Sequence, residues 1–116
     1  MPNRSPLPVE LLVRVAQTFR VLGDPSRLQI LQALMSGPRT VNEVAENTNK
    51  GQANVSKHLG LLADAGMVSR TPRGTQVVYR IADRLVYRLC DMVCGSVRDQ
   101  LAKQVEAHRQ ILKKSG

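Results

Sequence analysis

The hydrophobic period of this chain changes after Gly66, and that change limits the folds open to it. Before Gly66 the apolar residues recur at the spacing of amphipathic helices. Residues 67–71 and 76–81 are instead rich in β-branched side chains and alternate in polarity, with a turn at 72–75 between them. Helical spacing returns from about Arg84 to Lys113. The sequence therefore predicts a mainly α protein that carries one small β-hairpin.

Capping signals divide the first part of the chain into helices. The first helix is expected from about Pro8 to Leu22, where Gly23 ends it. Asp24-Pro25 combines a capping carboxylate with a proline at the first helical position, which is a strong start signal for a second helix. Gly37-Pro38 closes that second helix.

Two further helices are predicted before the hairpin. Thr40 and Glu43 have the spacing of a capping box, so a short third helix should begin there. Residues 47–51 are expected to form a tight polar turn into a fourth helix. Gly66 stops this fourth helix at its C′ position.

The second, third and fourth helices are short, and a hairpin follows them. This order predicts a winged helix-turn-helix fold. In that motif the third helix would cross the DNA backbone and the fourth would lie in the major groove. The exposed face of the fourth helix opens with polar or basic side chains, which can reach base edges and phosphates. The candidate DNA-binding residues are Lys50, Gln52, Ala53, Asn54, Ser56, Lys57 and His58, with Arg70 and Arg73 on the hairpin.

The charge balance favours an anionic partner. Lysine and arginine number 17 against 9 acidic residues, which gives a formal net charge of +8. Two histidines, no glycine-rich phosphate loop and no nucleophile–base motif leave little from which to build an enzyme site. Double-stranded DNA is therefore the predicted partner, and no catalytic activity is expected.

The chain length fits one small domain, predicted at 8–116 after a flexible arm at 1–7. No apolar run is long enough to span a bilayer, and Glu10 and Arg14 interrupt the stretch that a signal peptide would need. We therefore expect a cytoplasmic protein with no membrane partner, in which the two cysteines are free thiols, metal ligands or redox sensors.

The last helix is longer than a compact winged helix can cover. About 30 residues at 1.5 Å per residue extend about 45 Å. Its apolar stripe and that of the first helix are therefore predicted to pair with a second copy of the chain. Such a homodimer would place two recognition helices about 34 Å apart on a palindromic operator.

Three segments resemble the ArsR/SmtB family of bacterial transcriptional repressors: Leu22–Leu31, Val55–Val68 and Arg73–Arg80. The resemblance covers about residues 9–112. It implies a homodimeric repressor with the first and last helices at the interface, released from its operator by an inducer. One departure is the turn Asn49-Lys50-Gly51, where the family usually has a Gly-Leu-Ser type sequence. Asparagine can adopt the left-handed conformation that glycine supplies, and Lys50 could add a phosphate contact.

The cysteine and histidine clusters of the family's metal-sensing and persulfide-sensing members are absent from the expected places. The pair that remains is Cys90 and Cys94, four residues apart and so on one face of the last helix. Two thiolates could bind trivalent arsenic or another thiophilic metal ion, with further ligands from the second subunit or from solvent. Buried cysteine also packs as a small apolar residue, so the pair could equally be structural.

The sequence thus favours a DNA-binding repressor that responds to a thiophilic metal ion or a thiol oxidant. Two alternatives remain open. One is a repressor with no metal or redox inducer. The other is a winged-helix module that binds protein instead of DNA, although the polar face of Gln52, Asn54 and Lys57 argues against it.

Overall fold

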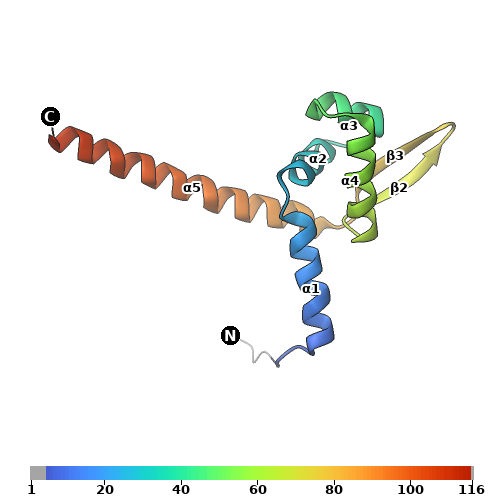
Figure 1. Cartoon of the computed structure of the whole chain (residues 1–116), viewed down its shortest axis with the longest axis horizontal. Coiled ribbons are helices and arrows are strands. Elements are labelled where there is room, and N and C mark those ends of the chain that lie inside the picture. The colour runs from blue at the N-terminus through green and yellow to red at the C-terminus, as the bar shows by residue number, and fades with distance from the viewer. Residues whose placement is uncertain (1–4, 116) are drawn as a thin grey trace. The chain divides into compact units, whose positions relative to one another are not determined.

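The computed structural model of this chain describes residues 5–115. Within them lie five helices and three strands, in the order predicted apart from one additional strand (Figure 1). The elements are α1 (Val9–Leu22), α2 (Pro25–Met35), β1 (Arg39–Thr40), α3 (Val41–Thr48), α4 (Gln52–Asp64), β2 (Val68–Arg73), β3 (Gln76–Ile81) and α5 (Arg84–Ser115). The chain divides into two compact units, the first ending at Asp83 and the second consisting of α5 and the end of the chain.

The predicted arm at 1–7 lies only partly within the described residues. Residues 1–4 fall outside them, and residues 5–8 belong to no helix or strand. α1 begins after Pro8, whose carbonyl oxygen accepts the N–H groups of Leu11 and Leu12 at 3.1 Å. α1 ends at Gly23, as predicted.

The predicted caps of α2 and α3 are present. The Asp24 carboxylate accepts the backbone N–H of Arg27 at 3.0 Å and so caps α2. In α3 both bonds of the capping box form, because Thr40 Oγ1 accepts the Glu43 N–H at 3.2 Å and Glu43 Oε1 accepts the Thr40 N–H at 3.0 Å. Local hydrogen bonds visible in the sequence therefore set both helix starts.

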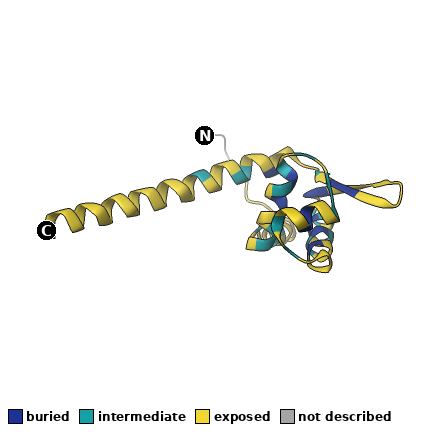
Figure 2. Ribbon diagram, turned by 90° about the horizontal axis from the view of Figure 1, so that it is seen from above, coloured by how far each residue is buried: buried dark blue, intermediate teal, exposed yellow. Residues whose placement is uncertain are grey.

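The core of the first unit is aliphatic and lies between α2, α3, α4 and the sheet. Its fully buried side chains come from all three helices, and every buried residue among those described except Val86 of α5 belongs to this unit (Figure 2). Each side chain contributes burial of apolar surface without any polar atom that needs a partner. The largest of them in this unit are Ile30, Leu31, Leu34, Val44, Val55, Leu59 and Leu62.

The sheet has three antiparallel strands in the order β1-β3-β2, so the prediction of a two-stranded hairpin was incomplete. β1 is only two residues long and therefore carries no alternation to detect. It pairs with β3 through Arg39 with Tyr79 and Thr40 with Val78. The side chain of Arg39 also donates to the carbonyl oxygen of Ala33 in α2 at 2.8 Å, which ties this strand to the end of that helix.

The hairpin turn is shorter than predicted. β2 continues through Pro72 and Arg73, which pair with Val77 and Gln76. Pro72 is tolerated because β2 is an edge strand, where a missing N–H breaks no ladder bond on the open side. Gly74 has a φ of 64°, a conformation that glycine adopts without strain, and it begins the tight turn.

α5 is a single helix of 32 residues, two residues longer at its end than predicted. Figure 2 shows it exposed along nearly its whole length. Among the described residues, no helix is both long and apolar enough to cross a membrane. The exposed large apolar side chains of α5 are Leu85, Tyr87, Met92, Val93, Val97, Leu101, Val105, Ile111 and Leu112.

Candidate nucleic-acid interface

The first half of α4 presents one buried and one exposed face. Val55 and Leu59 are fully buried, which holds the helix against the core. The cap, Gly51, has no side chain to bond the first N–H groups of the helix. The predicted DNA contacts that are exposed on this half are Gln52, Ala53, Asn54, Ser56 and Lys57. The recognition surface expected from the sequence is thus an accessible polar face on a firmly packed helix.

The turn between α3 and α4 is set by Asn49. Its φ of 55° and ψ of 43° place it in the left-handed region, as predicted for an asparagine standing where the family has glycine. The next residue, Lys50, donates its backbone N–H to the carbonyl oxygen of Ala45 at 3.0 Å. Together these features close the end of α3 and start the chain toward α4.

Lys50 is directed at the protein itself. Its Nζ lies 3.2 Å from Ser26 Oγ, and its side chain is half-buried. The contact joins the turn to the first residues of α2. A phosphate contact by Lys50 remains a prediction, and in this structure the ammonium group holds the turn in place.

His58 is half-buried, unlike the other predicted contact residues of α4. Its Nδ1 lies 3.4 Å from an Nη of Arg27 in α2. A guanidinium group only donates, so Nδ1 accepts here and the proton of the neutral ring belongs on Nε2. Arg27 was not among the predicted site residues, although it lies within the Leu22–Leu31 segment that carries the family resemblance.

The two predicted arginines of the wing lie on opposite faces of the hairpin. Arg70 pairs with Tyr79 and Arg73 pairs with Gln76, without a bulge between them. Side chains alternate along a strand, so residues three apart point to opposite sides. Arg73 instead shares its face with Arg80, which pairs with Ser69 near the start of β2.

A shallow hollow lies on each face of the hairpin. The hollow on the Arg70 side, about 280 Å³, includes Ser56 of α4 and therefore borders the recognition helix. The hollow on the other side, about 400 Å³, is lined by both Arg73 and Arg80. Arg80 is thus a basic residue of the wing that sequence reasoning missed. The sequence signal that could have identified it is strand alternation. Arg73 faces Gln76 across the turn, and every second residue from Gln76 leads to Arg80 on the same face.

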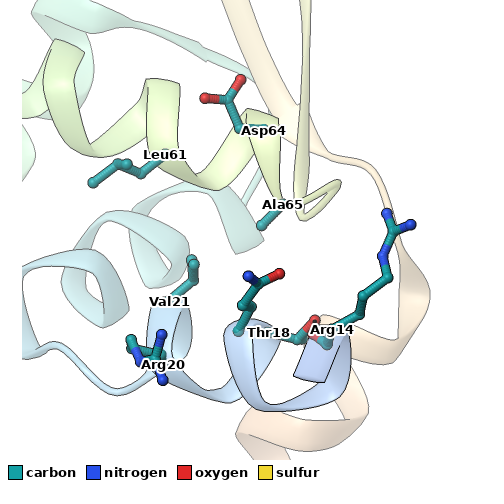
Figure 3. A pocket seen from close by; sticks show the side chains of 8 residues that line it. Arg14, Thr18, Arg20, Val21, Leu61, Asp64 and Ala65 are labelled. Atoms are coloured by element: carbon teal, nitrogen blue, oxygen red, sulfur yellow. Dashed lines mark hydrogen bonds between the residues drawn. The ribbon is translucent and has the colours of Figure 1, made fainter. Parts of the chain in front are cut away.

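A third hollow separates α1 from the second half of α4 (Figure 3). It has a volume of about 390 Å³. Val21 and Thr18 line it from α1, and Leu61 and Ala65 from the α4 side. No residue of α1 is buried, so this helix is only lightly packed on the rest of its unit.

The proposed sensing pair lies on α5. Cys90 is half-buried and Cys94 is exposed, and neither forms a disulfide. Burial raises the pKa of the Cys90 thiol, and the charges of Cys94 and Asp91 raise it further. Nowhere in residues 5–115 do three histidine, cysteine or acidic side chains gather closely enough to hold a metal ion. The pair therefore offers two soft donors, which is an incomplete ligand set for a thiophilic ion.

Known proteins match both the sequence and the fold. Residues 24–70 match the profile of a family described as bacterial regulatory protein, arsR family. The probable mercury resistance operon repressor of Streptomyces lividans is 40% identical over 78 residues, which cover 67% of this chain and 60% of that protein. The regulator NmtR of Mycobacterium tuberculosis is 37% identical over 87 residues, covering 75% of this chain and 72% of NmtR.

A solved structure agrees with these matches. The homodimeric winged helix-turn-helix DNA-binding domain of Mb0332 from Mycobacterium bovis superposes with a TM-score of 0.75 at 34% identity. The alignment covers 87% of this chain and 94% of that domain. The elements follow the order of a winged helix-turn-helix, and the relatives share about a third or more of their aligned residues with this chain. The chain therefore belongs to the arsR family of bacterial regulatory proteins.

Proposed function

We propose that this protein is a dimeric, sequence-specific DNA-binding repressor that an inducer releases from its operator. The observation that carries the proposal is that α4 has an exposed polar face opposite a fully buried apolar face. A helix held this firmly presents its side chains to a major groove with little further ordering, which favours selective binding.

The residue types on this face suit distinct roles. Gln52 and Asn54 carry amides that can form paired hydrogen bonds with adenine, whereas Ser56 and Lys57 are suited to phosphate oxygens. On the wing, Arg70 lies on the side that borders α4, and Arg73 stands beside the tight turn at the tip. We therefore assign base reading to the start of α4 and backbone contacts to the wing.

A second copy of the chain is proposed to cover the apolar faces of α1 and α5. Val9 and Phe19 on α1 are 70% and 62% exposed, and Met92 and Val105 on α5 are 72% and 60% exposed. Apolar stripes of this extent on two helices are typical of interaction surfaces. The Mb0332 domain, which has the same fold, is homodimeric.

For the inducer, we propose a thiophilic metal ion such as trivalent arsenic, or a thiol oxidant, acting at Cys90 and Cys94. The support is the spacing of the two thiols on one helix face and the similarity to a repressor named for mercury resistance. The second subunit or solvent would complete the ligand set. A repressor without a metal or redox inducer remains the alternative.

Fluorescence anisotropy with a palindromic and a scrambled duplex tests the DNA-binding proposal. Affinity should fall with salt at a slope set by roughly 6–10 phosphate contacts per dimer. Lys57→Gln should reduce that slope by about 1 per protomer, whereas the same change at Lys103, exposed on α5, should not. Equal affinity for both duplexes would contradict a sequence-specific repressor and would favour the protein-binding alternative.

The inducer proposal has a separate test. A variant carrying both Cys90→Ser and Cys94→Ser should bind the operator as the unmodified protein does but no longer release it with arsenite, cadmium or peroxide. If the double variant is released normally by these agents, the two cysteines are packing residues.

A further inference from the structure

The side chain of Arg27 in α2 forms hydrogen bonds with two other helices. Its Nε donates to the carbonyl oxygen of Val21 at 2.5 Å, and one Nη donates to that of Arg20 at 3.4 Å. Both acceptors belong to the last turn of α1. The other Nη faces His58 Nδ1 of α4 at 3.4 Å. One guanidinium group of α2 therefore touches both α1 and the recognition helix.

The packing around Arg27 gives this contact its importance. α1 buries none of its residues, and the hollow of about 390 Å³ separates it from the second half of α4. Close apolar packing therefore does little to transmit a movement of α1 to α4. The guanidinium group offers a rigid alternative, because its five donors diverge from one planar fork.

The base of the Arg27 side chain is itself held firmly. Its backbone N–H is bound by the Asp24 carboxylate at the start of α2, and the adjacent Ser26 accepts from Lys50 of the turn before α4. Ser26 thus accepts a hydrogen bond from Lys50, and Arg27 donates one to His58. Two neighbouring residues of α2 therefore hold both ends of the segment 50–58, which contains the exposed polar face. A displacement of α1 that drew the Arg27 guanidinium group with it would remove the partner of His58 Nδ1, one helical turn after Asn54.

We propose that Arg27 is a positioning residue that couples α1 to the recognition helix. Through its bonds to Arg20, Val21 and His58, the place of α1 sets the orientation of the first half of α4. This inference rests on the proposed function, since it gives α1 a part in controlling how DNA is read. A ligand or a partner subunit that shifts α1 would then change operator affinity without touching α4.

The first test needs no DNA. At a pH at which the ring is neutral, nitrogen-15 shifts of His58 in the full-length protein should show the ring proton on Nε2. Arg27→Lys keeps the positive charge but loses the fork. It should change that tautomer balance and shift the backbone amide signals of residues 54–58. Arg14→Gln alters an exposed arginine of α1 that lines the hollow, and it should leave both unchanged. Unchanged signals in a folded Arg27→Lys protein would overturn the proposal, whether or not the protein binds DNA.

The second test is a double-mutant cycle on operator affinity with Arg27→Gln and His58→Leu. Because His58 can also contact DNA directly, only the coupling between the two changes is informative, and we expect it to be about tenfold in Kd. Purely additive effects in variants that urea unfolding shows to be folded would refute the coupling. If the unmodified protein binds no operator, the repressor proposal fails, while the nuclear magnetic resonance test still decides the role of Arg27.

Discussion

The left-handed residue in the turn before α4 allows a sharp test of how the recognition helix is set. Asn49 has a φ of 55°, and it is the only non-glycine residue in the described chain with a positive φ. Replacing it with alanine keeps a small side chain but removes the amide that makes this conformation tolerable for asparagine. Asn49→Ala should therefore destabilise the folded protein at this one position.

The expected magnitude follows from the geometry. An alanine held in the left-handed region costs roughly 1–2 kcal/mol. The matched control is Asn47→Ala, which makes the same chemical change two residues earlier, at an exposed position inside α3. There alanine is the better helix former, so stability should rise by about 0.5 kcal/mol. The same substitution is thus expected to lower the free energy of unfolding at Asn49 and to raise it at Asn47.

Urea unfolding followed by circular dichroism, at one fixed protein concentration, measures the difference. The concentration must be held constant because a dimer's stability depends on it. In thermal unfolding each kcal/mol should move Tm by about 4–8 °C for a unit of this size. Asn49→Gly should stay close to the unmodified protein. If Asn49→Ala is as stable as Asn47→Ala, the left-handed conformation at residue 49 does not disfavour alanine, and the turn before α4 does not depend on asparagine.

Three further outcomes are expected. Leu59→Ala, at a fully buried position of α4, should lower the free energy of unfolding by about 3–5 kcal/mol in urea titrations. A smaller loss would mean that the core collapses around the cavity. The bond from a backbone N–H lowers the pKa of Asp24 from its ordinary 3.8, so the stability it adds is present above that value and is lost as pH falls through the lowered folded pKa. Asp24→Ser keeps a cap that does not titrate, so its Tm should fall less steeply in acid, and an identical acid profile would contradict this. Burial raises the pKa of Cys90, so iodoacetamide should label it more slowly than Cys94, and Asp91→Asn should speed that labelling. Mass spectrometry of the two peptides would expose the opposite order.

Elements set by nearby residues could be predicted from the sequence. The start of α2 depends on Asp24 and Pro25, and the start of α3 on Thr40 and Glu43, in each case through hydrogen bonds within one helical turn. The end of α4 at Gly66 follows from a glycine with a φ of 77°. The exposed polar face of α4 could likewise be read from periodicity, because burial of the opposite face leaves it no other place.

Features that depend on residues distant in the chain were decided only by the tertiary structure. β1 exists because Arg39 and Thr40 meet the free edge of β3, about 40 residues later in the chain and beyond any local pattern. The opposite facing of Arg70 and Arg73 depends on how far β2 continues before its turn. The partners of Lys50 and His58 lie in α2. Periodicity and caps record what each residue does with its near neighbours. Which helix a long polar side chain reaches depends on how the elements pack, and here that packing makes Arg27 a link between two helices.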